Sequence, residues 1–136
     1  MEHQKQAVLA AADRLIEAFG KHDRRRYFAA FSPAATFIFH NLGHRLNNRA
    51  EYEAQWAQWE SRDGFRIHAC HSSDRDVQIA GAVAIFTHNV QTELSFNGEP
   101  SSSAERETIV FERQPTGEWL AIHEHLSPHP ERDLKA

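Results

Sequence analysis

Two glutamates lie in a segment near the end of the chain whose pattern is typical of a β-hairpin. Residues 104–113 and 118–127 alternate apolar and polar side chains, and a turn rich in Pro and Gly separates them. The apolar alternation predicts a register in which Glu107 lies directly opposite Glu124 on the apolar face. Two carboxylates so placed repel, so one is expected to hold a proton and to be able to act as a general acid or base near neutral pH. The alternative is that Glu107 reaches solvent and Glu124 pairs with an arginine.

Histidine is unusually frequent, with 10 among 136 residues. His123 and His125 flank Glu124, and strand alternation places both on the hairpin face opposite the two glutamates, together with Trp119. The two imidazoles could bind zinc if a neighbouring strand supplied a third ligand such as His88. No H-E-x-x-H motif or cysteine set accompanies them, so hydrogen-bonded histidines at a sheet surface or subunit interface are favoured. We expect no metal and no other cofactor.

Aromatic residues predict a pocket for a small apolar or cyclic molecule. Tyr52, Trp56 and Trp59 repeat at i, i+4 and i+7, which places them on one face of a helix. Aromatic walls with a few polar groups are typical of small-molecule pockets, although the same residues could fill the core between helix and sheet. His40 is the last residue of a predicted strand and could face such a cavity. The candidate ligand-binding residues are Trp56, Trp59, Tyr27, Phe31, Arg106 and His88.

The elements that must position these residues are helices followed by strands. Amphipathic spacing predicts a helix over 3–20, Asp23 can cap a short second helix, and Asn48 begins a third helix that Asp63-Gly64 ends. The predicted strands are 35–40, 65–71, 75–80, 82–96, 104–113 and 118–127. This order predicts an α+β fold, with an antiparallel sheet folded over the helices. We expect one domain over residues 1–128 and a mobile tail over 129–136.

Composition narrows the classes of function. The net charge of −4 provides no basic stripe for phosphates, which argues against a nucleic-acid partner. Cys70 is the only cysteine, so an internal disulfide is excluded and a reduced, cytoplasmic location is expected. No apolar run approaches the length of a transmembrane helix, and the N-terminus lacks the apolar stretch of a signal peptide, so we expect no membrane association.

With these elements in order, the chain resembles the nuclear transport factor 2-like superfamily, in particular its SnoaL-like branch. This branch is related to the calcium/calmodulin-dependent kinase association domain and to ketosteroid isomerase-like proteins. The most specific match is R-E-T-I-V-F-E-R at 106–113, followed by G-E-W-L-A-I-H-E-H-L-S-P at 117–128. The resemblance implies a cone-shaped, curved antiparallel sheet wrapped around three helices, with a cavity at the open end. It also implies a homodimer through the outer sheet face, with Trp119, His123 and His125 as candidate contacts. A β-bulge in such a curved sheet could reverse the facing of part of a strand.

The activities of this superfamily include isomerisation, cyclisation and dehydration, as well as non-catalytic ligand capture and oligomerisation. For a catalytic protein we expect Glu124 to move a proton, Glu107 to tune its pKa and His40 to donate a hydrogen bond to a developing oxyanion. The isomerases use an acidic base with a tyrosine and a protonated acid, and neither Tyr27 nor Tyr52 matches that motif residue by residue. A non-catalytic binding or assembly module of the same fold is the alternative.

Overall fold

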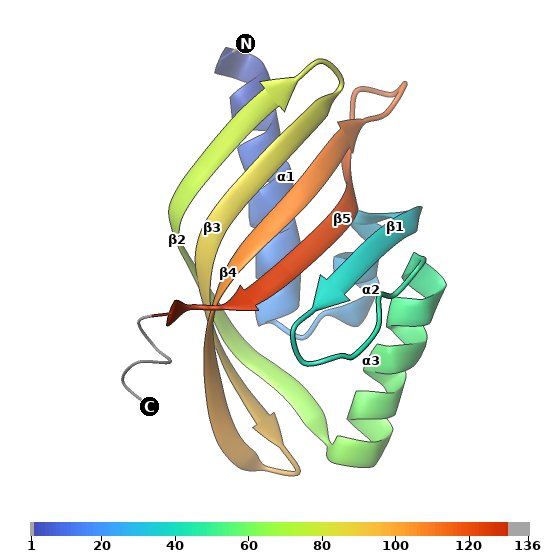
Figure 1. Ribbon diagram of the computed structural model, residues 1–136, viewed down its shortest axis with the longest axis vertical. Coiled ribbons are helices and arrows are strands. Elements are labelled where there is room, and N and C mark those ends of the chain that lie inside the picture. The colour runs from blue at the N-terminus through green and yellow to red at the C-terminus, as the bar shows by residue number, and fades with distance from the viewer. Residues whose placement is uncertain (1, 131–136) are drawn as a thin grey trace.

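Three helices and five strands make up residues 2–130, the part of the chain that the computed structural model describes (Figure 1). The elements are α1 (Glu2–Gly20), α2 (Arg24–Ala29), β1 (Phe31–Phe39), α3 (Arg49–Asp63), β2 (Phe65–Ala80), β3 (Val83–Phe96), β4 (Glu99–Arg113) and β5 (Trp119–Pro128). Within this range, no helix combines the length and apolar character needed to cross a membrane. The expected tail 129–136 lies outside the described residues, except for His129 and Pro130.

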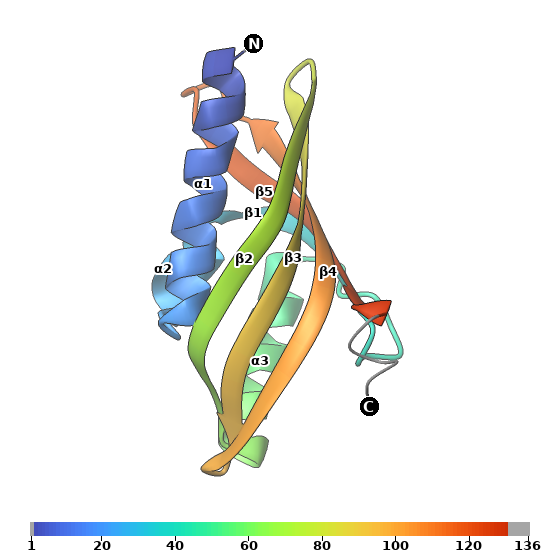
Figure 2. The same ribbon diagram turned by 90° about the vertical axis from the view of Figure 1, so that its left-hand side faces the viewer.

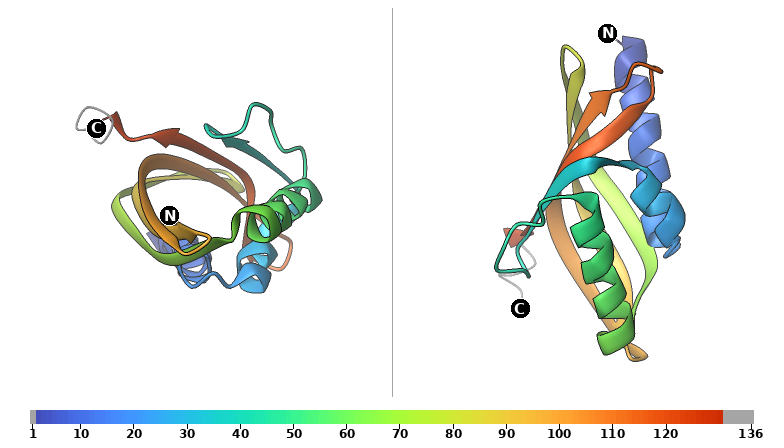
Figure 3. Two further views of the ribbon diagram at one scale, coloured as in Figure 1. Left: turned by 90° about the horizontal axis from the view of Figure 1, so that it is seen from below. Right: turned by 90° about the vertical axis from the view of Figure 1, so that its right-hand side faces the viewer.

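The strands form one sheet in the order β1-β5-β4-β3-β2. Neighbouring strands are antiparallel apart from β1 and β5, which are parallel. The sheet is therefore mixed, whereas the sequence predicts a wholly antiparallel one. The sheet curls without closing, and the helices lie along its inner side (Figures 2 and 3). The α+β class and the curved sheet over three helices are confirmed.

The helix boundaries follow from capping residues that the sequence already shows. The Asp23 side chain accepts a hydrogen bond from the Arg26 N–H at the start of α2. At the start of α3, the Asn48 side chain accepts from the Glu51 N–H at 2.8 Å. Gly64 ends α3 in the left-handed conformation, with φ of 61°. These caps satisfy backbone groups that would otherwise lack partners at the helix ends.

Several strands are longer than their patterns predict. β2 runs through residues 72–74, where the sequence predicts a break, because a bulge with Asp74 at φ of 52° absorbs the polar residues inside the strand. β1 begins at Phe31 and therefore includes Pro33, which a strand at the edge of a sheet tolerates. β4 begins at Glu99, directly after a tight turn, and not after the serines that follow.

The predicted register of the last hairpin is wrong, and a bulge explains how its glutamates still share a face. Near the turn Arg113 pairs with Trp119, one residue away from the prediction. This shift reverses the facing of Trp119, which is buried in the core with 6% exposure and cannot serve as an outer-face contact. The register then shifts again beyond Phe111, so Ile109 pairs with Glu124. Glu124 therefore points inward and lies diagonally across from Glu107, because its partner Ile109 is two residues from Glu107 along β4.

Gly64 offers a test of how α3 joins the sheet. A Cβ atom at this position would lie 2.3 Å from Asn97 Oδ1 and 2.8 Å from the Asn97 backbone nitrogen. We expect Gly64→Ala to lower the free energy of unfolding by at least about 2 kcal/mol, since close contact adds to the strain of a positive φ. Gly43→Ala is the matched control, because nothing lies within 4 Å of its Cβ. Urea unfolding of both variants measures the difference, and equal stability would contradict this account.

Candidate functional site

A cavity of about 310 Å³ lies between the inner face of the sheet and the helices. Its walls are mostly aromatic and aliphatic, with Trp56 and Trp59 from α3 among them. Its polar lining comes largely from carboxyl and hydroxyl groups: Tyr27, Tyr52, Asp63, Ser101, Ser103, Glu105, Glu107 and Glu124. The volume and composition suit a small molecule with an apolar body and one or two polar groups.

Two tyrosines and Glu124 form a buried hydrogen-bonded row beside this cavity. The Tyr27 hydroxyl, from α2, donates to Glu124 Oε1 at 3.2 Å. The hydroxyls of Tyr27 and Tyr52 lie 2.9 Å apart. Because the Tyr27 proton is directed to Glu124, Tyr52 is the donor of the second bond. Both phenols are thereby fixed as neutral donors that point along one direction, towards β5.

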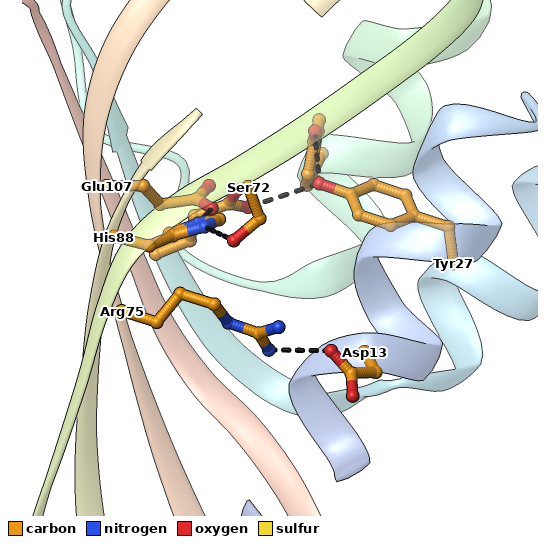
Figure 4. A network of polar contacts seen from close by, with 8 residues as sticks. Asp13, Tyr27, Ser72, Arg75, His88 and Glu107 are labelled. Carbon is orange, nitrogen blue, oxygen red and sulfur yellow. Dashed lines mark hydrogen bonds and ion pairs between the residues drawn. The ribbon is translucent and has the colours of Figure 1, made fainter. Parts of the chain in front are cut away.

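Ser72, His88 and Glu107 form a second row, contributed by the adjacent strands β2, β3 and β4 (Figure 4). Ser72 Oγ lies 2.6 Å from His88 Nδ1, and His88 Nε2 lies 2.6 Å from Glu107 Oε1. The imidazole is fully buried, and the Glu107 side chain is only 8% exposed. Alternate residues of each strand share a face, so three neighbouring strands bring these side chains together.

Burial sets the protonation of the two carboxyl groups. It raises the pKa of Glu107 to about 7 and that of Glu124 well above its ordinary range. A hydrogen bond joins the two carboxyls, and it lowers the pKa of Glu107 while raising that of Glu124. Glu124 is therefore the protonated donor, and Glu107 is the partner that ionises near neutral pH.

The groups around this pair remain uncharged. Burial, together with the nearby cation of Arg75, lowers the pKa of His88 to about 4, so its imidazole is neutral at pH 7. Burial, followed by the Glu124 charge, raises the pKa values of Tyr27 and Tyr52 well above 10. Among Glu107, Glu124, His88 and the two tyrosines, Glu107 has the pKa suited to taking up and releasing a proton at neutral pH.

The structure brings most of the candidate residues to this cavity, but not all of them. Trp56, Trp59 and Tyr27 line it, as do Glu107 and Glu124. His88 reaches it only through Glu107. Phe31 is fully buried in the hydrophobic core, and Arg106 is exposed on the outer sheet face, so neither is among the lining residues.

His40 lines a more exposed part of the cavity than the carboxyl pair. Its Nε2 lies 2.6 Å from Glu105 Oε2, and its side chain is 36% exposed. The carboxylate of Glu105 therefore occupies Nε2 of His40 in this structure.

Tyr52 and Ser72 are polar members of the site that the sequence patterns do not reveal. The helical spacing of Tyr52 with Trp56 marks the inner face of α3, but it does not show that the hydroxyl meets Tyr27. Ser72 lies in a polar stretch that reads as a break between strands, and only the bulged continuation of β2 turns it towards His88.

The outer face carries the histidine pair. The His123 and His125 rings lie 6.1 Å apart, and His123 Nδ1 is 2.8 Å from Thr36 Oγ1. His88 points to the other side of the sheet, so the three do not converge on one zinc site. Within residues 2–130, no three His, Cys, Asp or Glu side chains are placed to share a metal ion.

Comparisons with known proteins agree with this architecture. The model of the SnoaL-like domain family matches residues 8–130. An NTF2-like protein from Cytophaga hutchinsonii superposes with a TM-score of 0.78 at 15% identity, covering 93% of this chain and 98% of its own. A ketosteroid isomerase-like protein from Erwinia carotovora atroseptica gives 0.75 at 17% identity, with 90% and 94% covered. The association domain of C. elegans CaMKII gives 0.71 at 20% identity, with 93% and 96% covered. No curated protein matches the sequence.

The pH dependence of stability tests the buried carboxyl pair. A carboxyl whose pKa is raised on folding favours the folded state at low pH and loses that contribution as pH rises, here between the unfolded value near 4.5 and about 7. We expect the double variant Glu107→Gln/Glu124→Gln to be more stable than the wild type at pH 8, by about 1–3 kcal/mol. The advantage should shrink towards pH 5.

Chemical denaturation of both proteins at pH 5 and pH 8 gives the difference in their free energies of unfolding. The titration of His88 largely cancels in this difference, because both proteins contain His88. A double variant whose advantage over the wild type is the same at pH 5 and pH 8 would contradict the raised pKa values.

Proposed function

The chain belongs to the SnoaL-like domain family, and on this premise we propose that it binds a small, uncharged, carbonyl-bearing molecule and transforms it by general acid–base catalysis. The observation that carries this proposal is the carboxyl pair beside an aromatic cavity, in which Glu124 holds a proton and Glu107 ionises near neutral pH. Environments that push the pKa values of two neighbouring carboxyls apart supply an acid and a base within one site.

The proposed chemistry is transfer of a proton from a carbon next to a carbonyl group. The Glu107 carboxylate takes the proton, the electron pair of the C–H bond passes into an enolate, and the carbonyl oxygen gains negative charge. Return of the proton to another carbon gives an isomer. An enolate can also expel a hydroxyl group or attack a second carbonyl, which corresponds to dehydration or cyclisation.

The hydrogen bonds favour a different division of roles from the one that the sequence suggests. The sequence assigns the proton transfer to Glu124, whereas this proposal assigns it to Glu107, because the hydrogen bond between the two carboxyls raises the pKa of Glu124 and lowers that of Glu107. The oxyanion donor was expected to be His40, which is held by Glu105. The neutral hydroxyls of Tyr27 and Tyr52 line the cavity next to Glu124. In this proposal the carbonyl oxygen of the ligand replaces Tyr27 as the acceptor of the Tyr52 proton, so that Tyr52 donates to the developing negative charge.

Charge supports an uncharged ligand. Four carboxyl side chains line the cavity, namely those of Asp63, Glu105, Glu107 and Glu124, whereas no lysine or arginine is among the lining residues. An anionic ligand would lose its hydration and meet like charges without a compensating cation. The cavity therefore favours neutral over anionic ligands of the same shape.

A non-catalytic assembly module is the second candidate function. The outer sheet face exposes Ile38, His123 and His125 to different degrees, and one structural neighbour is named as an association domain. A homodimer through this face remains part of the proposal, with His123 and His125 but without Trp119. A cytoplasmic location is proposed with it, in keeping with the single reduced cysteine, Cys70.

Exchange of α-protons tests the catalytic proposal without knowledge of the natural substrate. We expect the protein to accelerate deuterium incorporation into 2-tetralone in D₂O, followed by NMR. Glu107→Gln should lower the enzyme-dependent rate by roughly 10²–10⁴-fold, since a positioned base contributes about that much. The wild-type rate should rise tenfold per pH unit and level off above pH 7, where Glu107 is ionised.

Glu112→Gln, an exposed change on the same strand, is the matched control and should leave the rate unchanged. Equal rates for wild type and Glu107→Gln would exclude Glu107 as the base.

A pair of ligands tests the charge preference. Quenching of tryptophan fluorescence by 2-acetylnaphthalene and 2-naphthoate at pH 8 compares a neutral and an anionic ligand of similar shape, with Trp56 and Trp59 as reporters in the cavity wall. We expect the neutral ketone to bind at least about tenfold more tightly, because the carboxylate meets Glu107 in its ionised form. Tighter binding of the naphthoate would contradict an acidic cavity.

A further inference from the structure

We propose that His88, fixed by Ser72, is a positioning residue that presents Glu107 to the cavity as an oriented carboxylate. This inference rests on the proposed role of Glu107 as the base. Neither Ser72 nor His88 lines the cavity, yet their side chains form a series of hydrogen bonds that ends at Glu107.

The geometry leaves His88 a single arrangement. Its ring is fully buried, and both nitrogens are occupied: Nδ1 by Ser72 Oγ and Nε2 by Glu107 Oε1, each at 2.6 Å. A neutral imidazole has one donor and one acceptor nitrogen. An ionised Glu107 can only accept, so the proton of the ring lies on Nε2 and points at Glu107, and the Ser72 hydroxyl donates to Nδ1. Oε1 of Glu107 is then an acceptor, and Oε2 is left for Glu124 and the cavity.

The surroundings keep the imidazole neutral. Arg75 of β2 lies over the Phe86 ring at 5.3 Å, and its guanidinium bonds to Asp13 of α1 at 2.6 Å (Figure 4). The Phe86 ring in turn lies 4.7 Å from that of His88. A cation on this side disfavours a second positive charge on the ring, and Glu124 on β5, which would favour that charge if it were ionised, holds a proton. Burial has the largest effect and keeps the imidazole neutral at pH 7.

A neutral donor serves a base better than a charged one. An imidazolium at 2.6 Å would form an ion pair with Glu107 and weaken its affinity for a substrate proton. A neutral N–H stabilises the carboxylate without forming an ion pair and holds one oxygen in place. The bond from Glu124 acts in the same way, so Glu107 receives donors from both sides.

Ser72, His88 and Glu107 also have the residue types of a nucleophilic triad, but the structure does not favour that role. Ser72 is not among the residues that line the cavity, so its hydroxyl is not presented to a ligand bound there. Its hydroxyl is used to fix the tautomer of His88, which is a positioning function.

A titration of Glu107 tests the proposal directly. The side-chain carboxyl carbon of Glu107 is followed by NMR in ¹³C-glutamate-labelled protein and is assigned by its loss in Glu107→Gln. We expect His88→Leu, which removes the donor, to raise the titration midpoint of Glu107 by about one pH unit, a tenfold change in proton affinity. His88→Gln keeps an N–H at the end of a side chain of similar reach and should restore most of the shift.

His68 provides the matched control. It bonds through Nε2 to Ser95 Oγ at 2.7 Å, and this Ser–His pair also joins β2 and β3 but contacts no carboxylate. His68→Leu should leave the Glu107 midpoint unchanged. If His88→Leu fails to fold, Ser72→Ala tests the proposal instead. Without the Ser72 hydroxyl the ring proton is no longer held on Nε2, so the titration midpoint of Glu107 should rise by a smaller, measurable amount.

An unchanged midpoint in His88→Leu, or an equal shift in His88→Leu and His88→Gln, would overturn the proposal, because the donor itself would then not matter. The exchange assay separates this inference from the proposed function. If the midpoint moves as expected but Glu107→Gln still exchanges 2-tetralone at the wild-type rate, the positioning of Glu107 stands and the catalytic role fails.

Discussion

Two carboxyl groups buried side by side can hold only one negative charge between them, and the polar part of this structure is arranged around that constraint. In an apolar setting the repulsion between two carboxylates far exceeds the cost of keeping one protonated. Glu124 holds the proton, and Glu107 carries the charge when it ionises. Every neighbouring hydroxyl and imidazole then has a defined direction, because each must donate towards the remaining charge.

The architecture of the sheet makes this arrangement possible. Four adjacent strands, β2 to β5, each contribute one polar side chain to a row across the inner face: Ser72, His88, Glu107 and Glu124. Bulges in β2 and β5 are needed for it. In β2, the register shift between Ile67 and Ala69 brings Ser72 onto the same inner face as Ile67, and the shift between Ser73 and Asp76 keeps the strand continuous past Ser72. The bulge in β5 turns Glu124 inward although Trp119 and Ala121 also face the core. Bulges therefore do more than bend the sheet, because they select which side chains reach the cavity.

The aromatic core supports the same site from the helix side. Tyr27 and Tyr52 are buried among Phe28, Phe31 and Trp56, and their only polar atoms point to each other and to Glu124. This packing excludes water and strengthens each hydrogen bond, but it also makes an ionised Glu107 costly. Retaining such a charge in the interior is typical of sites where stability is given up for function.

The fold family is implied by a resemblance to known sequences, whereas local patterns alone predict the element types, the helix caps and the location of two glutamates on one apolar face. These features depend on local propensities and on periodicity, which short stretches of residues contain in full. The register of the last hairpin, the burial of Trp119 and the contacts of Tyr52 and Ser72 were decided only by the tertiary structure. A bulge inserts one residue and reverses a strand's facing without any clear local signal, and a hydrogen bond between residues 97 positions apart, such as Tyr27 to Glu124, exists only once the helices have packed against the sheet.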